Sequence, residues 1–458
     1  MTETTRSRAT MGAGGLAVLL IGQTMASMDG SIVNVAVPTI RAELRASDAA
    51  IQLVIAGYLL TTGVLVVTCA RVGDLVGHRR AFLLGLAAFT AASLLCGLAP
   101  NAPTLVAGRI LQGCGGALMV PQVLSLIQLG HDGPRRDRAI ALYSMVLALG
   151  VALGQIAGGL IVSVDLFGLG WRPAFLINVP VGLALLGTGP RLLPGDEPGR
   201  HQRLDVSGVL ILTTAMTAIL LPLVFGREYG WSLWAWLGLG AGLLALAGFA
   251  RHERRAASPL LDLDVLGPRG IKPGLTACFI VMGCYAAFLF SLTVHLQSGL
   301  GFSPLGAGLT FVPYAAGFAT LSLTWARLPE RWQGPLTVLG PLALGGALAV
   351  LVALARDGWP TLVSVPLLLV AGGGHAAGYS PLIARLSARV DARHASGLAA
   401  LNSTGTLLAS VTGVAALGGV FLAAPDTSGG LASGVGLTVA LLLVAALCAF
   451  AARPADRS

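Results

Sequence analysis

The stretch ARVGDLVGHRR, residues 70–80, separates two long apolar runs of the chain. Its first part returns as ARLPE at residues 326–330, an offset of 256 residues. A second pair has nearly the same spacing, because GCGGALMVP at residues 113–121 resembles GGHAAGYSP at residues 373–381, an offset of 260 residues. Similar stretches at a nearly constant offset indicate an internal repeat. We therefore expect two related halves of six apolar segments each, an arrangement typical of transporters that bind their substrate between the halves.

The composition assigns the chain to the membrane. Of its 458 residues, 55% are hydrophobic and only 11% are charged, whereas a soluble domain carries about 25% charged residues. Such a chain cannot bury its apolar surface in one water-soluble globule, so we expect it to contact the lipid bilayer. The net charge of +9 resides mostly in short loops, which argues against nucleic acid as a partner. The six cysteines have no metal-site spacing, which predicts buried thiols and no metal site.

The apolar runs predict an all-α membrane protein. A helix that crosses about 30 Å of hydrocarbon needs about 20 residues. Fourteen predicted spans meet this length, at residues 12–40, 49–70, 80–99, 103–128, 138–163, 172–192, 205–226, 232–250, 273–297, 303–326, 335–354, 360–384, 395–422 and 431–452. The repeat assigns residues 1–192 to an N-terminal six-helix bundle, residues 193–255 to a linker with two inserted helices, and residues 256–458 to a C-terminal six-helix bundle.

The distribution of basic residues predicts the orientation in the membrane. Lysine and arginine are enriched in cytoplasmic loops. If both termini are cytoplasmic, the cytoplasmic segments hold 23 basic residues and the outer segments hold five. We therefore expect a multi-pass protein of the cell inner membrane with both termini in the cytoplasm. The first apolar run exceeds the roughly 7–15 residues of a signal-peptide core, so we expect it to be retained as a span.

The stretch at residues 70–80 resembles the signature G-x-L-A-D-R-x-G-R-R of the major facilitator superfamily. Asp74, Gly77, Arg79 and Arg80 match positions of that signature. An aspartate can pair with charges and cap a helix end, and a glycine permits a tight turn. The resemblance implies the major facilitator fold, and we interpret these four residues as a loop that acts as a latch during conformational change.

Further stretches are similar to the fourteen-span drug:proton antiporter branch of this superfamily. They are MDGSIVNVAVP at residues 28–38, GRILQGCGGALMVP at 108–121, WRPAFLINVPVG at 171–182 and LQSGLGFSPLGAGLTFVP at 296–313. The resemblance implies efflux of drugs or antibiotics in exchange for protons.

Two features depart from this branch. Gln155 stands where the span-five pattern G-x-x-x-G-P-x-x-G-G has proline. In addition, the last six predicted spans contain no aspartate or glutamate. Some members of the branch use extra acidic residues in late spans to bind cationic drugs, so this absence argues against a dicationic substrate.

Asp29 and Arg109 are the main candidates for proton coupling, because each places a charge inside a predicted span. At 1.5 Å per residue, the two lie at similar depths below the outer ends of their spans. An isolated charge at that depth costs about 2.5–3.5 kcal/mol on insertion scales, so we expect the two to pair or to face water. A salt bridge that only fixes helix packing is the structural alternative. We prefer a functional role, in which separation of the pair lets Asp29 bind a proton on one side of the membrane and release it on the other.

His375 is the third candidate for proton coupling, since it corresponds to Gly115 in the repeat and histidine titrates near neutral pH. A hydrogen-bonded residue in the cavity wall is an equally good interpretation. Other polar residues inside the predicted spans are candidates to line a substrate cavity. These are Gln23, Asn34, Gln112, Gln155, Asn178, Tyr285, Gln297, Tyr314, Tyr379 and Asn402.

Several enzyme motifs are missing from the sequence. A phosphate-binding loop needs G-K-[ST], and proline follows the single lysine, Lys272. Neither H-E-x-x-H nor G-x-S-x-G occurs. We therefore expect a monomeric transporter without cofactor or metal, and not an enzyme. Its expected function is proton-coupled efflux of small amphipathic compounds by alternating access. The alternatives are a proton-coupled importer on the same scaffold and a membrane sensor that transports nothing.

Overall fold

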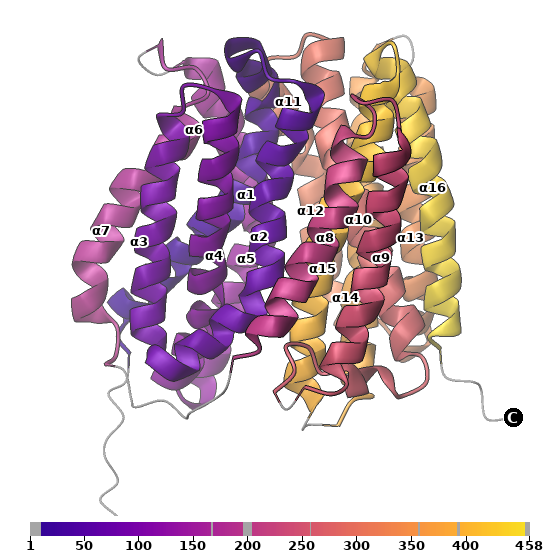
Figure 1. Ribbon diagram of the computed structural model, residues 1–458. Helices are drawn as coiled ribbons and strands as arrows, with labels where there is room; N and C mark the ends of the chain where they lie inside the picture. The colour runs from indigo at the N-terminus through magenta and orange to yellow at the C-terminus, as the bar shows by residue number, and fades with distance from the viewer. Residues whose placement is uncertain are drawn as a thin grey trace, which may run out of the picture.

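The computed structural model (Figure 1) describes residues 11–165, 168–195, 204–256, 258–355, 358–391 and 394–453, and all regular secondary structure in these ranges is helical. The helices are α1 (Ala13–Leu44), α2 (Asp48–Val76), α3 (His78–Gly97), α4 (Ala102–Gly130), α5 (Gly133–Val164), α6 (Pro173–Leu176), α7 (Asn178–Leu192), α8 (Val206–Phe225), α9 (Leu233–Glu253), η2 (Leu263–Leu266), α10 (Ile271–Val294), η3 (His295–Gly299), α11 (Pro304–Thr310), α12 (Val312–Thr324), η4 (Trp325–Arg327), α13 (Glu330–Leu354), α14 (Thr361–Ser387), α15 (Ala395–Ala423) and α16 (Thr427–Ala451).

Thirteen helical segments of the described ranges are long and apolar enough to cross a bilayer. Helix α5, which has 32 residues and no charged residue from position 139 to position 164, adds the fourteenth crossing. Three crossings join more than one element. They are Pro173–Leu192 (α6 and α7), Ile271–Gly299 (α10 and η3) and Pro304–Arg327 (α11, α12 and η4). The predicted all-helical membrane fold with fourteen spans is therefore confirmed.

Polar residues mark the starts of several helices. The side chains of Ser47, Asn101, Asp205, Ser303 and Asp426 each accept a hydrogen bond from a backbone N–H in the first turn of the helix that follows. Such caps satisfy N–H groups that have no partner within the helix. These residues therefore fix where α2, α4, α8, α11 and α16 begin.

The stretch at residues 70–80 is not the loop that we expected. Helix α2 continues beyond the predicted end at residue 70 to Val76, and α3 begins at His78. Only Gly77 lies between them, with a φ of 97°. Glycine enters this region of backbone conformation without steric cost, so a single residue makes the turn. The predicted tight turn at Gly77 is correct, but the residues before it are helical.

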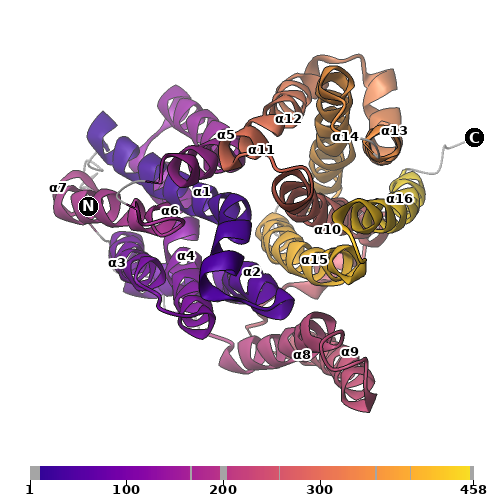
Figure 2. The same ribbon diagram turned by 90° about the horizontal axis from the view of Figure 1, so that it is seen from above.

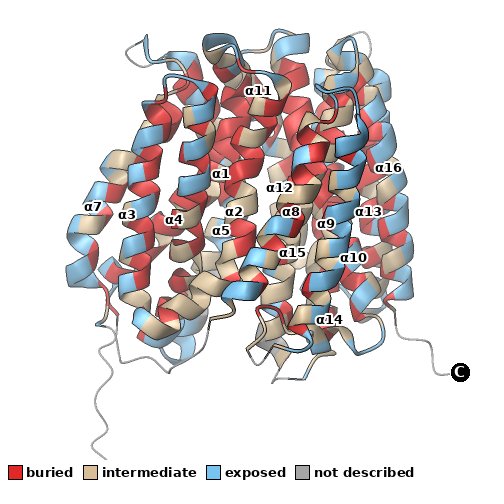
Figure 3. Ribbon diagram, in the orientation of Figure 1, coloured by how far each residue is buried: buried red, intermediate tan, exposed pale blue. Residues whose placement is uncertain are grey.

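Viewed from above, the helices form two groups (Figure 2). Helices α1 to α7 lie on one side and α10 to α16 on the other, while α8 and α9 lie outside both groups. Helices α8 and α9 pack on each other, and α8 also contacts α2 and α15. Exposed residues lie along the outward sides of the helices (Figure 3), and many of these exposed residues are large and apolar, as expected for helices that face lipid.

Glycines let neighbouring helices approach closely. A Cβ atom placed on Gly115 of α4 would lie 2.4 Å from the backbone nitrogen of Phe89 in α3. In the other half, a Cβ atom on Gly372 of α14 would lie 1.9 Å from the backbone oxygen of Tyr314 in α12. Both distances are too short for a carbon atom, so these contacts require glycine. Small residues at helix interfaces are typical of membrane proteins.

The two faces of the molecule differ in how the helix groups meet. We call the face where α1 begins and α16 ends the terminal face, and the other the opposite face. Near the opposite face, the Leu305 backbone N–H donates to Ser163 Oγ at 3.0 Å, and Gln297 Nε2 donates to the Val35 carbonyl at 3.0 Å. A Cβ atom on Gly159 would lie 2.7 Å from the Pro304 carbonyl oxygen. Helices α1 and α5 therefore pack directly on η3 and α11 at this face.

Candidate functional site

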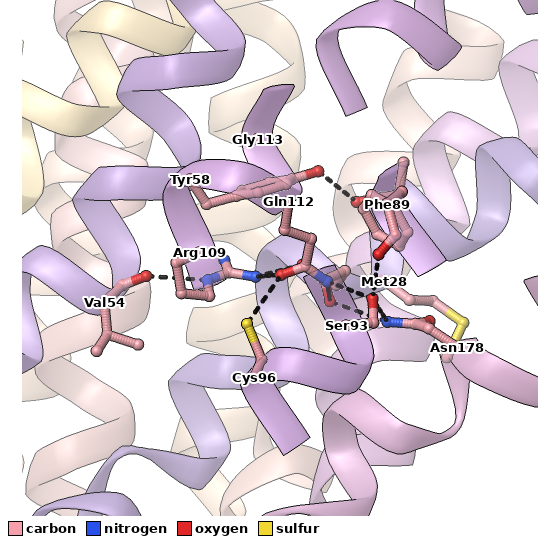
Figure 4. A network of polar contacts seen from close by, with 12 residues as sticks. Met28, Val54, Tyr58, Phe89, Ser93, Cys96, Arg109, Gln112, Gly113 and Asn178 are labelled. Atoms are coloured by element: carbon pink, nitrogen blue, oxygen red, sulfur yellow. Dashed lines mark hydrogen bonds and ion pairs between the residues drawn. The ribbon is translucent and has the colours of Figure 1, made fainter. Parts of the chain in front are cut away.

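A buried polar network joins five helices of the first group (Figure 4). Asp29 on α1 and Arg109 on α4 are each 1% exposed, and Arg109 Nη1 donates a hydrogen bond to Asp29 Oδ2. Gln112 Nε2, one turn along α4, donates to Asp29 Oδ1 at 2.7 Å. Asn178 Nδ2, at the start of α7, donates to the same oxygen at 3.1 Å. The predicted pairing of Asp29 with Arg109 is present, and two amides complete it.

Arg109 is held from several sides. Its Nε donates to the Val54 carbonyl oxygen of α2 at 3.0 Å, and its Nη1 also donates to Gln112 Oε1 at 2.6 Å. The guanidinium carbon lies 4.3 Å from the centre of the Tyr58 ring, within the range of a cation–π interaction. The centre of the Phe175 ring lies 5.7 Å from the same carbon, so three hydrogen bonds and two aromatic rings fix this side chain in the interior.

The contacts of Asp29 are those of an ionised carboxylate. Both oxygens accept hydrogen bonds from neighbouring donors, and an ionised carboxylate is acceptor-only. Oδ1 already accepts from both Gln112 and Asn178, so a proton on this oxygen requires one of these amides to move. A proton on Oδ2 would weaken the ion pair with Arg109.

Ser93 of α3 also belongs to the network, although the sequence did not single it out. Its Oγ accepts from Gln112 Nε2 at 2.9 Å and donates to the Phe89 carbonyl oxygen at 2.8 Å. It is fully buried. Ser93 lies three residues after Thr90, so both lie on one face of α3. That spacing was the only signal in the sequence, and it is weak because serine is common in membrane helices.

A central cavity of about 660 Å³ lies between the two helix groups. Its wall includes Gln23 and Asn34 from α1 and Tyr285 from α10, three of the residues expected to line a substrate cavity. Further polar side chains in the wall are Ser27, Ser31, Tyr58, Thr62, Tyr143, Ser403, Thr406 and Ser410. Among the described residues that line the cavity, none is aspartate, glutamate, lysine or arginine. The cavity therefore suits an amphipathic compound better than an ion.

The cavity extends from the middle of the molecule toward the terminal face. Its wall reaches Ala70 near the end of α2, Leu124 on the last turns of α4, and Ala399 at the start of α15. These positions are near the terminal face, and the contacts at Ser163 and Leu305 lie near the opposite face. The cavity thus separates the two helix groups on the terminal side, where contacts of α2 with α15 and of Arg71 with Ser258 still connect them, and the groups are joined on the opposite side.

Tyr58 lies between the cavity and the buried network. Its side chain lines the cavity, and its ring packs on the guanidinium of Arg109. Its hydroxyl donates to the Ala26 carbonyl oxygen of α1 at 3.3 Å. Asp29 and Arg109 themselves do not line the cavity, so Tyr58 separates them from it.

A second cavity, of about 200 Å³, lies mainly in the other helix group. It brings together Gln155 of α5, Tyr285 of α10, Tyr314 of α12, and His375 and Tyr379 of α14, all of which the sequence had marked as candidates. The Tyr314 hydroxyl and His375 Nδ1 are 2.9 Å apart. His375 is 3% exposed.

The other predicted site residues lie elsewhere. Gln112 and Asn178 contact Asp29 and do not line either cavity. Asn402 Nδ2 donates to the Tyr379 hydroxyl at 2.9 Å, behind the second cavity. Gln297 lies in the contact between α1 and η3. The sequence identified polar residues inside spans, but it did not show which way each helix face points.

The turn at Gly77 is linked to several other helices. His78 lies 3.4 Å from Asp74 through Nε2, and its Nδ1 lies 2.7 Å from Gln122 Oε1 of α4. Arg79 donates to the Pro190 carbonyl oxygen of α7. One turn earlier, Arg71 donates to the Ser258 carbonyl oxygen at 3.1 Å, in the segment before α10. Arg79 and Arg80 make further contacts within the molecule.

A third cluster, Asp205, His252 and Glu253, has donor atoms within 4.8 Å of one another. His252 Nε2 lies 2.9 Å from Asp205 Oδ2, and the Leu261 backbone N–H donates to Glu253 Oε2 at 2.7 Å. Asp205 also caps α8. These contacts tie α8 and α9 to the segment before α10, and we assign the cluster a structural role.

Comparison with known proteins identifies related transporters. The model of the Major Facilitator Superfamily matches residues 19–414. A probable actinorhodin transporter from Streptomyces coelicolor is 36% identical over 417 residues, covering 89% of this chain and 72% of that protein. Drug efflux pump JefA from Mycobacterium tuberculosis is 34% identical, covering 92% and 81%. Puromycin resistance protein pur8 from Streptomyces alboniger is 36% identical, covering 88% and 80%.

Solved structures show the same fold at low sequence identity. A peptide transporter POT superposes with a TM-score of 0.68 at 16% identity, covering 96% of both chains. A bacterial homolog of the human lysosomal transporter Spinster, in an inward-facing and unoccupied conformation, gives a TM-score of 0.66 at 18% identity, again covering 96% of both chains.

Proposed function

The chain belongs to the major facilitator superfamily, and from this membership we propose that it exports small amphipathic compounds, such as antibiotics or toxic metabolites, in exchange for protons. It is a multi-pass membrane transporter of small molecules. Relatives that it matches over most of their length are named as an antibiotic transporter, a drug efflux pump and an antibiotic resistance protein. The central cavity, mostly apolar with scattered hydroxyl and amide groups, supports the same class of substrate.

The observation that carries proton coupling is the buried network around Asp29. An ionisable residue inside a membrane protein is costly to keep and is by default a functional candidate. Asp29 accepts donors from Arg109, Gln112 and Asn178, so its ionised form is stabilised only while these three stay in place. A movement of α1 against α4 or α7 removes donors and favours the protonated acid. The helix rearrangement of the transport cycle thereby controls proton binding.

In alternating access, the substrate cavity opens to one side of the membrane at a time. We propose that both termini are cytoplasmic, as the basic residues suggest, so that the cavity of this structure faces the cytoplasm. Export then requires the contacts of α1 and α5 with η3 and α11 to open and the terminal side to close. The turn at Gly77, tied by His78 to Gln122 and by Arg79 to Pro190, would hold α2, α3, α4 and α7 together as they move, which is the role we propose for Asp74, Gly77, Arg79 and Arg80.

The same proposal covers the organisation of the chain. The two moving bundles would be formed by residues 1–192 and 256–458. An added helix pair would be formed by residues 193–255. The transporting unit would be the monomer. The exclusion of α8 and α9 from both helix groups supports this division (Figure 2). Each bundle would then form one wall of the cavity.

Transport by the purified chain tests the proposal. Cells with and without the chain are compared for accumulation of amphipathic antibiotics, including puromycin, and an exported compound is then followed in proteoliposomes with an imposed pH gradient. We expect lower accumulation in cells, and uphill transport that collapses when a protonophore is added. Higher accumulation would indicate an importer, and unchanged distribution of every compound would favour a sensor. Uphill transport with ATP as the sole energy source would refute proton coupling.

A further inference from the structure

The second cavity contains a buried amide with no hydrogen-bond partner. Gln155 is 1% exposed, and neither its Nε2 nor its Oε1 has a partner among the described residues. Most buried polar side chains in folded proteins are hydrogen-bonded, because an unpaired donor or acceptor costs stability. Gln155 lines this cavity, although both of its polar atoms are themselves buried, so a molecule inside the cavity reaches them once the side chain turns toward it.

The rest of the wall consists largely of flat rings. The His375 ring lies 4.6 Å from the Tyr285 ring and 4.8 Å from the Phe318 ring, measured between centres. Tyr314 stacks on Tyr285 with an interplanar angle of 16°. Aromatic side chains bind other aromatic rings by stacking or by edge-to-face contact. The cavity therefore offers aromatic surfaces together with one unsatisfied amide.

We propose that this cavity is a subsite for a planar, uncharged aromatic part of the exported compound, whose carbonyl or hydroxyl edge hydrogen-bonds with Gln155. The inference rests on the proposed export function and adds the substrate class. An amide offers two N–H donors and one carbonyl acceptor, so a ring carbonyl can accept from Gln155 Nε2 and a free ring hydroxyl can donate to Gln155 Oε1. A ring with neither group would leave the amide unpaired, and the subsite discriminates against it.

Size and charge agree with this assignment. A cavity of about 200 Å³ is smaller than the roughly 300–1,000 Å³ of a typical site for a drug-sized ligand, so it holds one end of a compound. Leu147, Met282, Tyr285 and Leu289 line both cavities, so the two are adjacent and the remainder of the compound would lie toward the central one. Neither wall includes an aspartate, glutamate, lysine or arginine among the described residues, and an ion without a counter-charge is costly to bury.

Binding to the purified, full-length chain tests the subsite. Two three-ring probes are measured by equilibrium dialysis in detergent. The first is 1-hydroxyanthraquinone, which is uncharged and offers ring carbonyl oxygens as acceptors for Gln155 Nε2. The second is N-methylacridinium, a cation without a carbonyl or hydroxyl group. We expect the first to bind more tightly. Aromatic cages also bind organic cations, so tighter binding of N-methylacridinium would overturn the uncharged class.

Variants locate the binding to this cavity. Gln155→Leu removes the amide and keeps a similar volume, and we expect it to weaken binding of 1-hydroxyanthraquinone by about tenfold or more. Phe318→Leu should weaken binding of both probes through loss of an aromatic face. Gln52→Leu is the matched control, because Gln52 is also buried, has an unpartnered Oε1, and lies outside both cavities. Equal affinity in Gln155→Leu and the parent chain would refute the subsite.

Thermal unfolding without ligand separates a binding role from a structural one. If Gln155 serves the ligand, Gln155→Leu removes an unsatisfied amide and leaves the Tm unchanged or higher. A lower Tm with unchanged probe affinity would show a structural role and overturn the proposal. Because dialysis does not depend on transport, the two proposals fail separately. If cells export the compounds but Gln155→Leu binds the probe as tightly as the parent chain, only the subsite is refuted. If probe binding depends on Gln155 but cells show no export, only the efflux function is refuted.

Discussion

In one half of the molecule, the oxygens of Asp29 accept hydrogen bonds from Arg109, Gln112 and Asn178. In the other half, His375 is buried among tyrosine and phenylalanine rings, and these rings share the second cavity with Gln155 of α5, an amide from the first half that has no partner. The first cluster is an aspartate–arginine pair whose hydrogen bonds are satisfied, whereas the second consists of aromatic rings and an unsatisfied amide. We infer a division of labour, in which the first half binds the proton, and the rings of the second half, together with Gln155, bind the aromatic part of the substrate.

The internal repeat makes this contrast informative. At the offset of 260 residues, Arg109 corresponds to Leu369 and Gly115 corresponds to His375. Each half thus places its functional side chain where the other half has an apolar or small residue. Gly115 allows α4 to pack on α3, whereas His375 points into a cavity. Helix α4 packs on α2 and α3, and α14 packs on α12 and α13, so the related helices keep corresponding neighbours while their polar chemistry has diverged.

The largest effect is expected from Arg109→Ala. It leaves Asp29 buried without its cationic partner, and breaking a buried ion pair in this way costs about 3–5 kcal/mol. The carboxyl group will escape part of that cost by staying protonated. We expect low expression, a lower Tm, and complete loss of export driven by a pH gradient. Expression and Tm are measured by fluorescence-detected gel filtration with heating, and transport is measured in proteoliposomes.

Arg172→Ala is the control for loss of an arginine. Arg172 pairs with Glu43 at 2.6 Å, but both side chains are partly exposed, so the pair contributes at most about 1 kcal/mol. It should change stability and transport little. If Arg109→Ala transports normally with an unchanged pH dependence, proton coupling does not depend on this pair in the first half, and the contrast between the two halves is wrong.

Asp29→Asn should separate coupling from folding. Asparagine keeps the shape of the side chain and removes the proton-binding group, so it resembles a permanently protonated acid. Exchange of substrate down its own gradient should continue, since movement of the bundles does not need proton release. Uphill export driven by a pH gradient should fall to background, because no step then carries a proton.

The contrast between these two assays excludes misfolding, which would abolish both. Both are run at matched protein amount in the same vesicles. If Asp29→Asn exports uphill at the rate of the parent chain, another residue must bind the coupled proton, and His375 is the next residue to test.

These predictions depend on residues that the sequence revealed to different degrees. Asp29 and Arg109 stand out because a charge in an apolar run is costly wherever the helix face points. Gly77 was predictable as a turn from its motif, but the motif did not show that α2 and α3 extend to meet it. Tyr58 and Ser93 gave no comparable signal, since tyrosine and serine are ordinary in membrane helices. Their roles follow from helix rotation and packing, which the sequence pattern does not specify.

A smaller effect is expected from His375→Asn. In our division of labour, His375 forms part of the aromatic subsite and does not carry the coupled proton. The variant should therefore keep export driven by a pH gradient, with a change of a few-fold in apparent affinity for aromatic substrates. Apparent KM and the number of protons moved per substrate are both measured in proteoliposomes. If the proton-to-substrate ratio fell while the KM stayed the same, proton coupling would extend into the second half and the contrast between the halves would fail.

The smallest effect is expected from Tyr58→Phe, which tests the boundary between the cavity and the proton site. The phenylalanine ring still covers the Arg109 guanidinium, where the ring of Tyr58 now lies 4.3 Å away. Only the hydroxyl contact with the Ala26 carbonyl is lost, a hydrogen bond worth about 0.5–1.5 kcal/mol. We expect coupled export close to that of the parent chain.

Tyr58→Ala is the variant to compare with Tyr58→Phe, because it removes the ring that separates the cavity from Arg109 and Asp29. Water from the cavity should then reach the carboxylate, and protons should enter vesicles under a pH gradient without any substrate. Proton influx is followed with a pH-sensitive dye enclosed in the vesicles, and Tyr58→Phe and the parent chain should show none above background. If Tyr58→Ala is as proton-tight as Tyr58→Phe, the barrier lies deeper, at the donors of Gln112 and Asn178. The access of protons to Asp29 would then depend on α1, α4 and α7 alone and not on the wall that faces the substrate.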